Sequence, residues 1–323
     1  MSSGYSAFLA SGSDGRIRWH PTLAVHPPLL ASLEEHFQNL KLNMEGSNPT
    51  TLRASPLLHS LHVYFRPREL NTVKTSPLLT HVQTQIVDSP NLVELSMGIG
   101  SLGCVIYDVD PKFARLKRRR FPPLEKLTLE AFPLTVKNVA YWMENMDWSQ
   151  MEVLDLRAIK EPTHFFNEAM KLAGGLPRLK ALRMELPWFR EARDLQEFED
   201  TFRRFLDVPR ETGLSEVALE GDYRPYLQTI LDGQGATLKK LQLHDPERSY
   251  EPQREMLSEP ELSDLAQRAP NLEDISIDIN YTLNGSLVSP FARSPTMTVC
   301  SSTGCGSRRK LWTHSCPRLR FHP

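Results

Sequence analysis

SPNLVELSMGIGSLG, residues 89–103, supports two different interpretations of this chain. Its second half places Gly98, Gly100 and Gly103 in the pattern G-x-G-x-x-G after an apolar run, which is typical of a dinucleotide-binding turn. Its first half places Leu92, Leu95 and Met97 in the pattern L-x-x-L-x-L, which recurs along the chain. A dinucleotide-binding turn and a repeat motif require different sequences around them, so the neighbouring sequence decides between the two interpretations.

The apolar triplet of the first half occurs in eight clear copies. The copies are Leu58/Leu61/Val63, Leu92/Leu95/Met97, Leu124/Leu127/Leu129, Met151/Leu154/Leu156, Leu179/Leu182/Met184, Leu214/Val217/Leu219, Leu238/Leu241/Leu243 and Leu272/Ile275/Ile277. Their first anchors are 34, 32, 27, 28, 35, 24 and 34 residues apart, and a weaker copy, Phe37/Leu40/Leu42, precedes them. A fixed apolar signature at uneven spacing is typical of structural repeats whose connections vary in length.

Each triplet predicts a short strand with its apolar side chains on one face. Because side chains alternate between the faces of a strand, the second and third anchors point the same way, and the first anchor turns inward just before the strand. One repeat cannot cover such a face, whereas stacked repeats build a continuous core. We therefore expect all three anchors of every copy to be buried.

The segments between the triplets predict helices. Apolar residues recur at helical spacing over residues 135–146, 164–172, 195–206 and 262–269. In the first of these, the spacing assigns Val136, Val139, Ala140 and Met143 to the apolar face. Alternating strands and helices of similar length predict parallel strands joined by right-handed crossovers.

This organisation resembles the leucine-rich repeat, whose consensus begins L-x-x-L-x-L, in the looser form found in many fungal F-box proteins. The resemblance implies an α/β solenoid (horseshoe) over residues 31–282, with parallel strands on the concave face and helices or loops on the convex face. Residues 1–30 would then be a poorly ordered N-terminal flank. Residues 283–323, rich in Ser, Thr, Arg and Pro, would be a C-terminal tail of low order.

The same resemblance implies a non-catalytic protein that binds a protein partner on the concave sheet, as the substrate-recognition part of an SCF-type ubiquitin ligase. In that family an F-box before the repeats binds the cullin adaptor, but the nearest candidate here, residues 27–33, lacks the F-box pattern. We therefore expect adaptor binding only from a longer product that carries an F-box, and a truncated or mis-spliced chain is our working hypothesis. A generic leucine-rich-repeat scaffold unrelated to ubiquitination is the alternative.

The glycine motif fits a loop better than a cofactor site. A dinucleotide site needs a helix to begin at the third glycine and an acidic residue about 20 residues later. Residues 104–111 instead read as extended chain that stops at Asp110-Pro111, and Asp108 and Asp110 follow Gly103 too early. We expect Gly98 to be the last outward strand position, where the missing side chain lets the chain leave the sheet, and Gly100 and Gly103 to form the turn. A nucleotide-dependent oxidoreductase built on these glycines remains the enzyme alternative.

Composition excludes several classes of protein. The 38 Lys and Arg residues balance 39 Asp and Glu residues, giving a formal charge of −1, which argues against a protein that coats nucleic acid or acidic membrane. No apolar run is long enough to span a membrane, and the first residues lack the pattern of a secretory signal. Four cysteines in 323 residues do not make a disulfide framework. These features predict an intracellular protein, cytoplasmic or nuclear.

Other motifs carry little chemistry. Residues 9–19 resemble the end of a WD-repeat blade, but a propeller needs several copies and no second copy exists. Cys300, Cys305, His314 and Cys316 lack the paired spacing of a zinc site. The basic run 117–120 is read as a solvated loop, with a nuclear-localisation or acidic-partner patch as the alternative. No nucleophile elbow or spaced catalytic triad is present, so we predict no enzyme activity, no cofactor and no metal.

If the anchors point inward, the residues between and just after them form a partner-binding face. The candidate binding residues on this face are Lys126, Glu130, Asp155, Arg157, Arg183, Glu185, Lys240 and His244. Arginine is enriched at interface hot spots, which favours Arg157 and Arg183. The alternative is that these charges only keep the sheet soluble.

Overall fold

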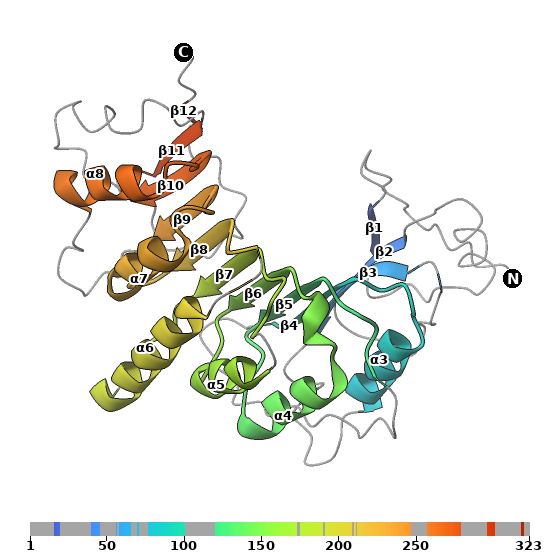
Figure 1. Cartoon of the computed structure of the whole chain (residues 1–323). Coiled ribbons are helices and arrows are strands. Elements are labelled where there is room, and N and C mark those ends of the chain that lie inside the picture. The colour runs from blue at the N-terminus through green and yellow to red at the C-terminus, as the bar shows by residue number, and fades with distance from the viewer. Residues whose placement is uncertain are drawn as a thin grey trace, which may run out of the picture. The chain divides into compact units, whose positions relative to one another are not determined.

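The structure is a computed structural model of the chain. Figure 1 shows its helices and strands. The chain divides into two compact units, Met1–Leu172 and Ala173–Pro323, which are described one at a time. The residues that the structure describes are 16–19, 40–45, 56, 58–65, 70, 77–100, 120–172, 175–189, 191–208, 210, 212–246, 257–278, 296–300 and 318–319.

In the first unit, six strands pair in chain order and every pairing is parallel. They are β1 (Arg16–Trp19), β2 (Leu40–Glu45), β3 (Leu58–Phe65), β4 (Glu94–Ile99), β5 (Lys126–Glu130) and β6 (Val153–Arg157). The helices are α3 (Pro77–Val87), α4 (Val136–Asn145) and α5 (Thr163–Lys171), with a short 3-10 helix, Trp148–Gln150, before β6.

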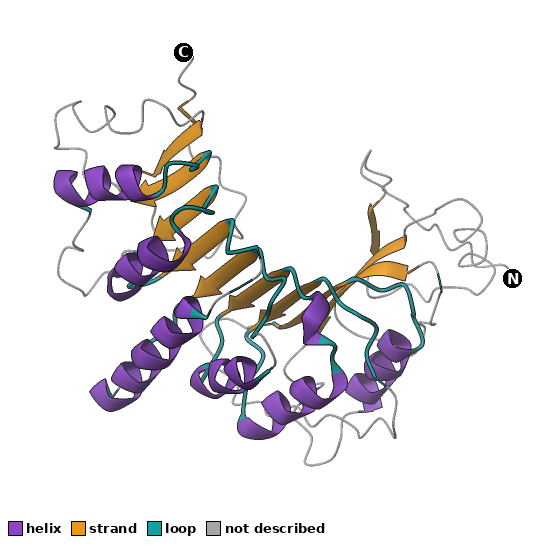
Figure 2. Cartoon of the chain, in the orientation of Figure 1, coloured by secondary structure: helices purple, strands orange, loops and turns teal. Residues whose placement is uncertain are grey.

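In the second unit, β7 (Ala181–Glu185), β8 (Glu216–Glu220), β9 (Lys240–His244) and β10 (Asp274–Asp278) are likewise parallel and in chain order. A fifth strand, β11 (Thr296–Cys300), pairs in parallel with β10, and β12 (Arg318–Leu319) pairs with β11 in the antiparallel sense. The helices are α6 (Ala192–Asp207), α7 (Arg224–Gln234) and α8 (Glu259–Arg268). Figure 2 shows the helices of each unit on one side of its strands. The expected α/β class with parallel strands is therefore confirmed.

The repeated apolar triplets form the core of both units. All three anchors of all eight copies are buried, and the most exposed of them, Leu272, is only 8 % exposed. Strand register places equivalent anchors side by side, so that Leu95 pairs with Leu127 and Leu127 with Leu154. Each buried aliphatic side chain contributes about 1.5–3 kcal/mol relative to an exposed one. This confirms the assignment of the anchors to the inward face.

The repeats are also joined by a recurring set of hydrogen bonds. The N–H groups of Glu125 and Lys126, just after the first anchor Leu124, both donate to the carbonyl of Val93, at 2.8 and 3.0 Å. At the starts of β6, β8, β9 and β10, two successive N–H groups likewise donate to one carbonyl of the preceding repeat. In two copies a Pro-Asn-Leu sequence adds a side-chain bond: Asn91 donates to the Pro56 carbonyl at 2.6 Å and Asn271 to the Ala236 carbonyl at 2.7 Å. These bonds fix each repeat on the one before it.

The predicted helices are present, but one apolar face differs from the prediction. α4 occupies residues 136–145 of the predicted 135–146. Its buried residues are Asn138, Val139 and Trp142, whereas Val136 is 63 % exposed and Ala140 is also exposed. The helix is therefore rotated from the expected face, because the ring of Trp142 fills the core and Asn138 can be buried by donating to the Pro133 carbonyl at 3.1 Å.

Two helices, α3 and α7, were not predicted. α7 contains Pro225 and Gly233, two residues that usually interrupt helices, but Pro225 lies in the first turn, where its missing N–H costs nothing. Where α7 ends, a Cβ on Gly235 would lie 2.5 Å from the Arg268 carbonyl at the end of α8. Glycine at this position therefore lets the ends of the two helices approach each other.

Several sequence predictions lie outside the described residues. These are the F-box-like stretch 27–33, the basic residues 117–119, Gly103, Cys305, His314, Cys316 and most of the flank 1–30 and tail 283–323. Of the WD-like stretch only Arg16–Trp19 is described, as β1, and Cys300 is the last residue of β11.

Candidate protein-binding surface

In each unit, the strand residues between the anchors lie on the face that the described helices leave uncovered, which we call the helix-free face (Figure 2). Parallel register places equivalent positions of neighbouring strands in rows. In the first unit the rows are Ser60-Glu94-Lys126-Val153, His62-Ser96-Thr128-Asp155 and Tyr64-Gly98-Glu130-Arg157. In the second unit they are Ala181-Glu216-Lys240-Asp274, Arg183-Ala218-Gln242-Ser276 and Glu185-Glu220-His244.

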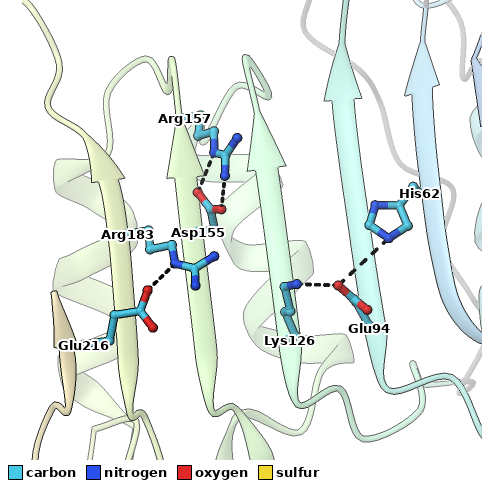
Figure 3. Close-up of polar contacts among 7 residues, drawn as sticks. All are labelled: His62, Glu94, Lys126, Asp155, Arg157, Arg183 and Glu216. Carbon is cyan, nitrogen blue, oxygen red and sulfur yellow. Dashed lines mark hydrogen bonds and ion pairs between the residues drawn. The ribbon is translucent and has the colours of Figure 1, made fainter. Parts of the chain in front are cut away.

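Glu94 is the centre of a polar cluster on the first unit (Figure 3). Its carboxylate accepts a hydrogen bond from Lys126 Nζ at 2.5 Å and another from Ser60 Oγ at 3.0 Å. His62 Nε2 lies 3.9 Å from the same carboxylate. Burial by itself would raise the pKa of Glu94, but the hydrogen bond and charge of Lys126, together with Ser60 and His62, hold this pKa below its ordinary value. The cluster therefore keeps Glu94 ionised at neutral pH.

Ser60, His62 and Glu94 are the residue types of a hydrolytic triad, but their geometry does not fit one. Ser60 Oγ lies 3.1 Å from His62 Nε2, yet its single proton is donated to Glu94. The imidazole must then donate its own proton to the hydroxyl, which prevents it from acting as a base toward Ser60. Ser60 is also only 1 % exposed. In this geometry the three side chains therefore do not form a hydrolytic triad.

Asp155 and Arg157 form a bidentate pair within β6 (Figure 3). Arg157 Nε donates to Oδ1 at 2.9 Å and its terminal nitrogen donates to Oδ2 at 2.6 Å. The Asp155 side chain is 3 % exposed, whereas that of Arg157 is 32 % exposed. The predicted outward position of Asp155 is thus on the helix-free face but buried, so Arg157 is the member of the pair that can reach a partner.

The second unit carries two further pairs on its helix-free face. Arg183 Nε donates to Glu216 at 2.7 Å, with side chains 38 % and 18 % exposed (Figure 3). His244 Nδ1 lies 2.9 Å from Asp278, whose buried carboxylate also accepts the backbone N–H of Asp245 at 2.8 Å. Each pair links two neighbouring strands, β7 to β8 and β9 to β10, and the Asp245 bond ties the residue after β9 to β10. These contacts hold the side chains in place.

Gly98 has a different role from the one expected. β4 continues through it to Ile99, so the chain does not leave the sheet there. A Cβ on Gly98 would lie 2.4 Å from Cε2 of Tyr64, the neighbour in register, so the glycine makes room for that ring. A Cβ on Gly100 would lie at least 3.5 Å from its neighbours, an ordinary contact, so of these two glycines only Gly98 is needed to make room for Tyr64. The enzyme alternative was built on Gly98, Gly100 and Gly103, and the third of these glycines lies outside the described residues.

The structure brings some candidate residues together and adds others. Lys126, Arg157, Arg183 and His244 each take part in a pair, Lys240 and Glu185 are exposed, and Glu130 is half-buried beside Arg157 in register. Their partners include Glu94 and Glu216, which the strand alternation also places on this face, and Ser60, His62 and Asp278, which were not among the candidates. Their motif positions were readable, because Ser60, Glu94 and Lys126 all lie two residues after a first anchor, and Asp278, like His244, directly follows a third anchor.

The Glu94 cluster predicts a pH-dependent contribution to stability. Because the pKa of Glu94 is lower in the folded state, its contribution is present above the unfolded pKa and is lost as pH falls through the folded pKa. We expect Lys126→Met to lower the free energy of unfolding by about 0.5–1 kcal/mol at neutral pH, since both groups are partly exposed and screened. Urea denaturation should show this difference shrinking toward zero as the pH falls through the lowered folded-state pKa of Glu94.

The matched control for this measurement is Lys137→Met, which removes an exposed lysine from α4 and should leave the unfolding free energy unchanged at both pH values. A loss for Lys126→Met that stays constant with pH would show that the contact with Glu94 is not its cause.

Within the described residues, no group of three or more His, Cys, Asp or Glu side chains is placed to hold a metal ion. In the same part of the chain, none of the helices has the length and apolar character needed to cross a membrane. A scan against protein-family models finds no match to this chain, and a search of curated proteins finds no similar sequence.

Proposed function

We propose that this chain is a leucine-rich-repeat protein that binds a protein partner, without catalysis, through its helix-free face. The observation that carries the proposal is the eightfold apolar triplet, whose inward burial leaves the alternate strand positions on a face that none of the described helices covers. Repeats of this kind commonly use such a face for binding.

The helix-free face has properties that suit recognition of a protein. Six of its charged groups are already held in the pairs Glu94–Lys126, Asp155–Arg157 and Arg183–Glu216, so these side chains lose less freedom when a partner binds. Arg157 and Arg183 remain about one third exposed and can donate further hydrogen bonds to a partner. The mixture of signs favours a partner with mixed surface charge over a nucleic acid.

We further propose, from the sequence resemblance alone, that the chain acts inside the cell as the substrate-recognition part of an SCF-type ubiquitin ligase. The generic scaffold is distinguished from this role by the cullin adaptor. Co-purification of the adaptor with a longer product that carries an F-box would support the ligase role. If the longer product binds a partner on the helix-free face but does not co-purify with the adaptor, the result would support the generic scaffold.

The binding face can be tested by placing a long side chain at its middle without removing an existing ion pair. Thr128→Arg and Gln242→Arg do this in the first and second units, because both residues are half-buried in the middle row. With a partner identified by affinity purification, we expect each variant to weaken binding at least about tenfold in isothermal titration.

The matched controls put the same side chain on the helices. Glu144→Arg on α4 and Gln228→Arg on α7 replace exposed residues and should bind the partner as the natural chain does. Equal affinity for all four variants would refute the helix-free face as the binding surface.

A further inference from the structure

Tyr64 lies against the backbone of the neighbouring strand on the helix-free face of the first unit. It is half-buried near the end of β3, in register with Gly98 on β4 and with Glu45 on β2. A Cβ on Gly98 would lie 2.4, 2.8 and 3.0 Å from Cε2, Cδ2 and Cζ of the tyrosine ring. The ring therefore occupies the place that a side chain of residue 98 would fill.

Glu130 is the next residue of the same row. It is in register with Gly98 on β4 and with Arg157 on β6, and it is half-buried. Because residue 98 has no side chain, none stands at that position between the Tyr64 ring and Glu130. Among the described residues, the Glu130 carboxylate has no ion-pair or hydrogen-bonding partner. The row therefore places an aromatic ring beside an unpaired carboxylate.

The charges on this face of β3–β6 leave Glu130 without a counterion. The acidic and basic side chains there are His62, Glu94, Lys126, Glu130, Asp155 and Arg157. Lys126 is paired with Glu94, and Arg157 donates two hydrogen bonds to Asp155 (Figure 3). Three carboxylates thus face two permanent cations, and both cations are held by carboxylates other than Glu130. A positive charge brought to Glu130 complements this face.

We propose that Tyr64 and Glu130 bind an arginine side chain of the protein partner, with its guanidinium over the tyrosine ring and hydrogen-bonded to the carboxylate. A planar guanidinium stacks on an aromatic face and donates two parallel hydrogen bonds to a carboxylate, which suits both groups at once. The inference rests on the proposed function, because it names the chemistry by which a partner contacts the helix-free face. If the ring only covered the backbone of Gly98, neither Glu130 nor a cation would be needed.

The test follows the amide of Gly98 by NMR in the full chain while the peptide acetyl-Gly-Arg-Gly-amide is added. Met97-Gly98 is the only Met-Gly step in the sequence, so 13C at the methionine carbonyl and 15N at the glycine nitrogen select this one amide. We expect a saturable shift with a dissociation constant of about 1–10 mM. The same peptide with citrulline, which keeps the shape of arginine without its charge, should bind at least about fivefold more weakly.

Two variants remove one group each. Glu130→Gln and Tyr64→Leu should each weaken binding of the arginine peptide at least about fivefold, whereas Tyr64→Phe keeps the ring and should bind within about twofold of the natural chain. The matched control is Glu144→Gln, which neutralises an exposed carboxylate on α4 and should leave the affinity unchanged. Absence of a saturable shift, or equal affinity for the citrulline peptide or for Glu130→Gln, overturns the proposal.

This result and the test of the whole face can differ. If partner binding is weakened by Thr128→Arg but the arginine peptide does not bind, the proposed function stands and the arginine site is wrong. If Thr128→Arg leaves partner binding unchanged while the peptide binds as expected, the proposed function fails and the arginine site stands.

Discussion

Leu127→Asp is expected to unfold the unit that contains β5. Leu127 is fully buried and lies between Leu95 and Leu154 in register, so a carboxylate there has no water and no partner cation. The variant loses the burial of the leucine, worth about 2–5 kcal/mol, and adds the cost of desolvating a polar group, about 1–3 kcal/mol or more. This sum is comparable to the whole stability of a typical domain, about 5–15 kcal/mol.

The fluorescence of Trp142 and Trp148, which are buried in the same unit, reports this unfolding. The matched control is Val153→Asp, which places the same carboxylate on the helix-free face opposite Lys126 in register. We expect the control to unfold at nearly the natural urea concentration. If Leu127→Asp has the same unfolding midpoint as the natural chain, the assignment of the triplets to the core is wrong.

Arg157→Met is expected to have the next largest effect on stability. It removes both hydrogen bonds to the Asp155 carboxylate, which is almost fully buried. Removing one partner of a buried ion pair costs about 3–5 kcal/mol, and we expect about 2–4 kcal/mol here because Arg157 itself is partly exposed. The measurement is the free energy of unfolding from urea denaturation.

A double-mutant cycle isolates this pair. Asp155→Asn in the Arg157→Met background should recover part of the loss, because an amide is less costly to bury than an unpaired carboxylate. Arg183→Met is the matched control, because its partner Glu216 is more exposed than Asp155 and accepts one hydrogen bond from Arg183 Nε. This variant should cost less than about 1 kcal/mol. Additive effects in the cycle would mean that Arg157 does not stabilise Asp155.

The inward face was predictable because it depends on spacing alone. Anchors such as Leu92, Leu95 and Met97 are buried wherever the strand alternation is kept, and equivalent anchors align because the strands are parallel. The same logic predicts which residues share a row on the helix-free face.

Burial and pairing within the rows were less predictable. Sequence position places Asp155 outward. Only the position of the Arg157 side chain in the structure shows that the Asp155 carboxylate is buried beneath this ion pair. Likewise Val136 has the right spacing for the core yet lies exposed in the first turn of α4, because the bulk of Trp142 sets the rotation of the helix. Side-chain volume and pairing across strands are three-dimensional properties that a linear pattern does not contain.

Site-specific photocrosslinking tests the central claim, that a protein partner binds the helix-free face, most directly. A photoreactive residue at Thr128 or Gln242 reports on that face, and one at Lys137 or Gln228 reports on the exposed sides of α4 and α7. We predict that the purified partner crosslinks to the first two positions and not to the other two. Crosslinks only from the helix positions, or equal yields from all four, would contradict the account.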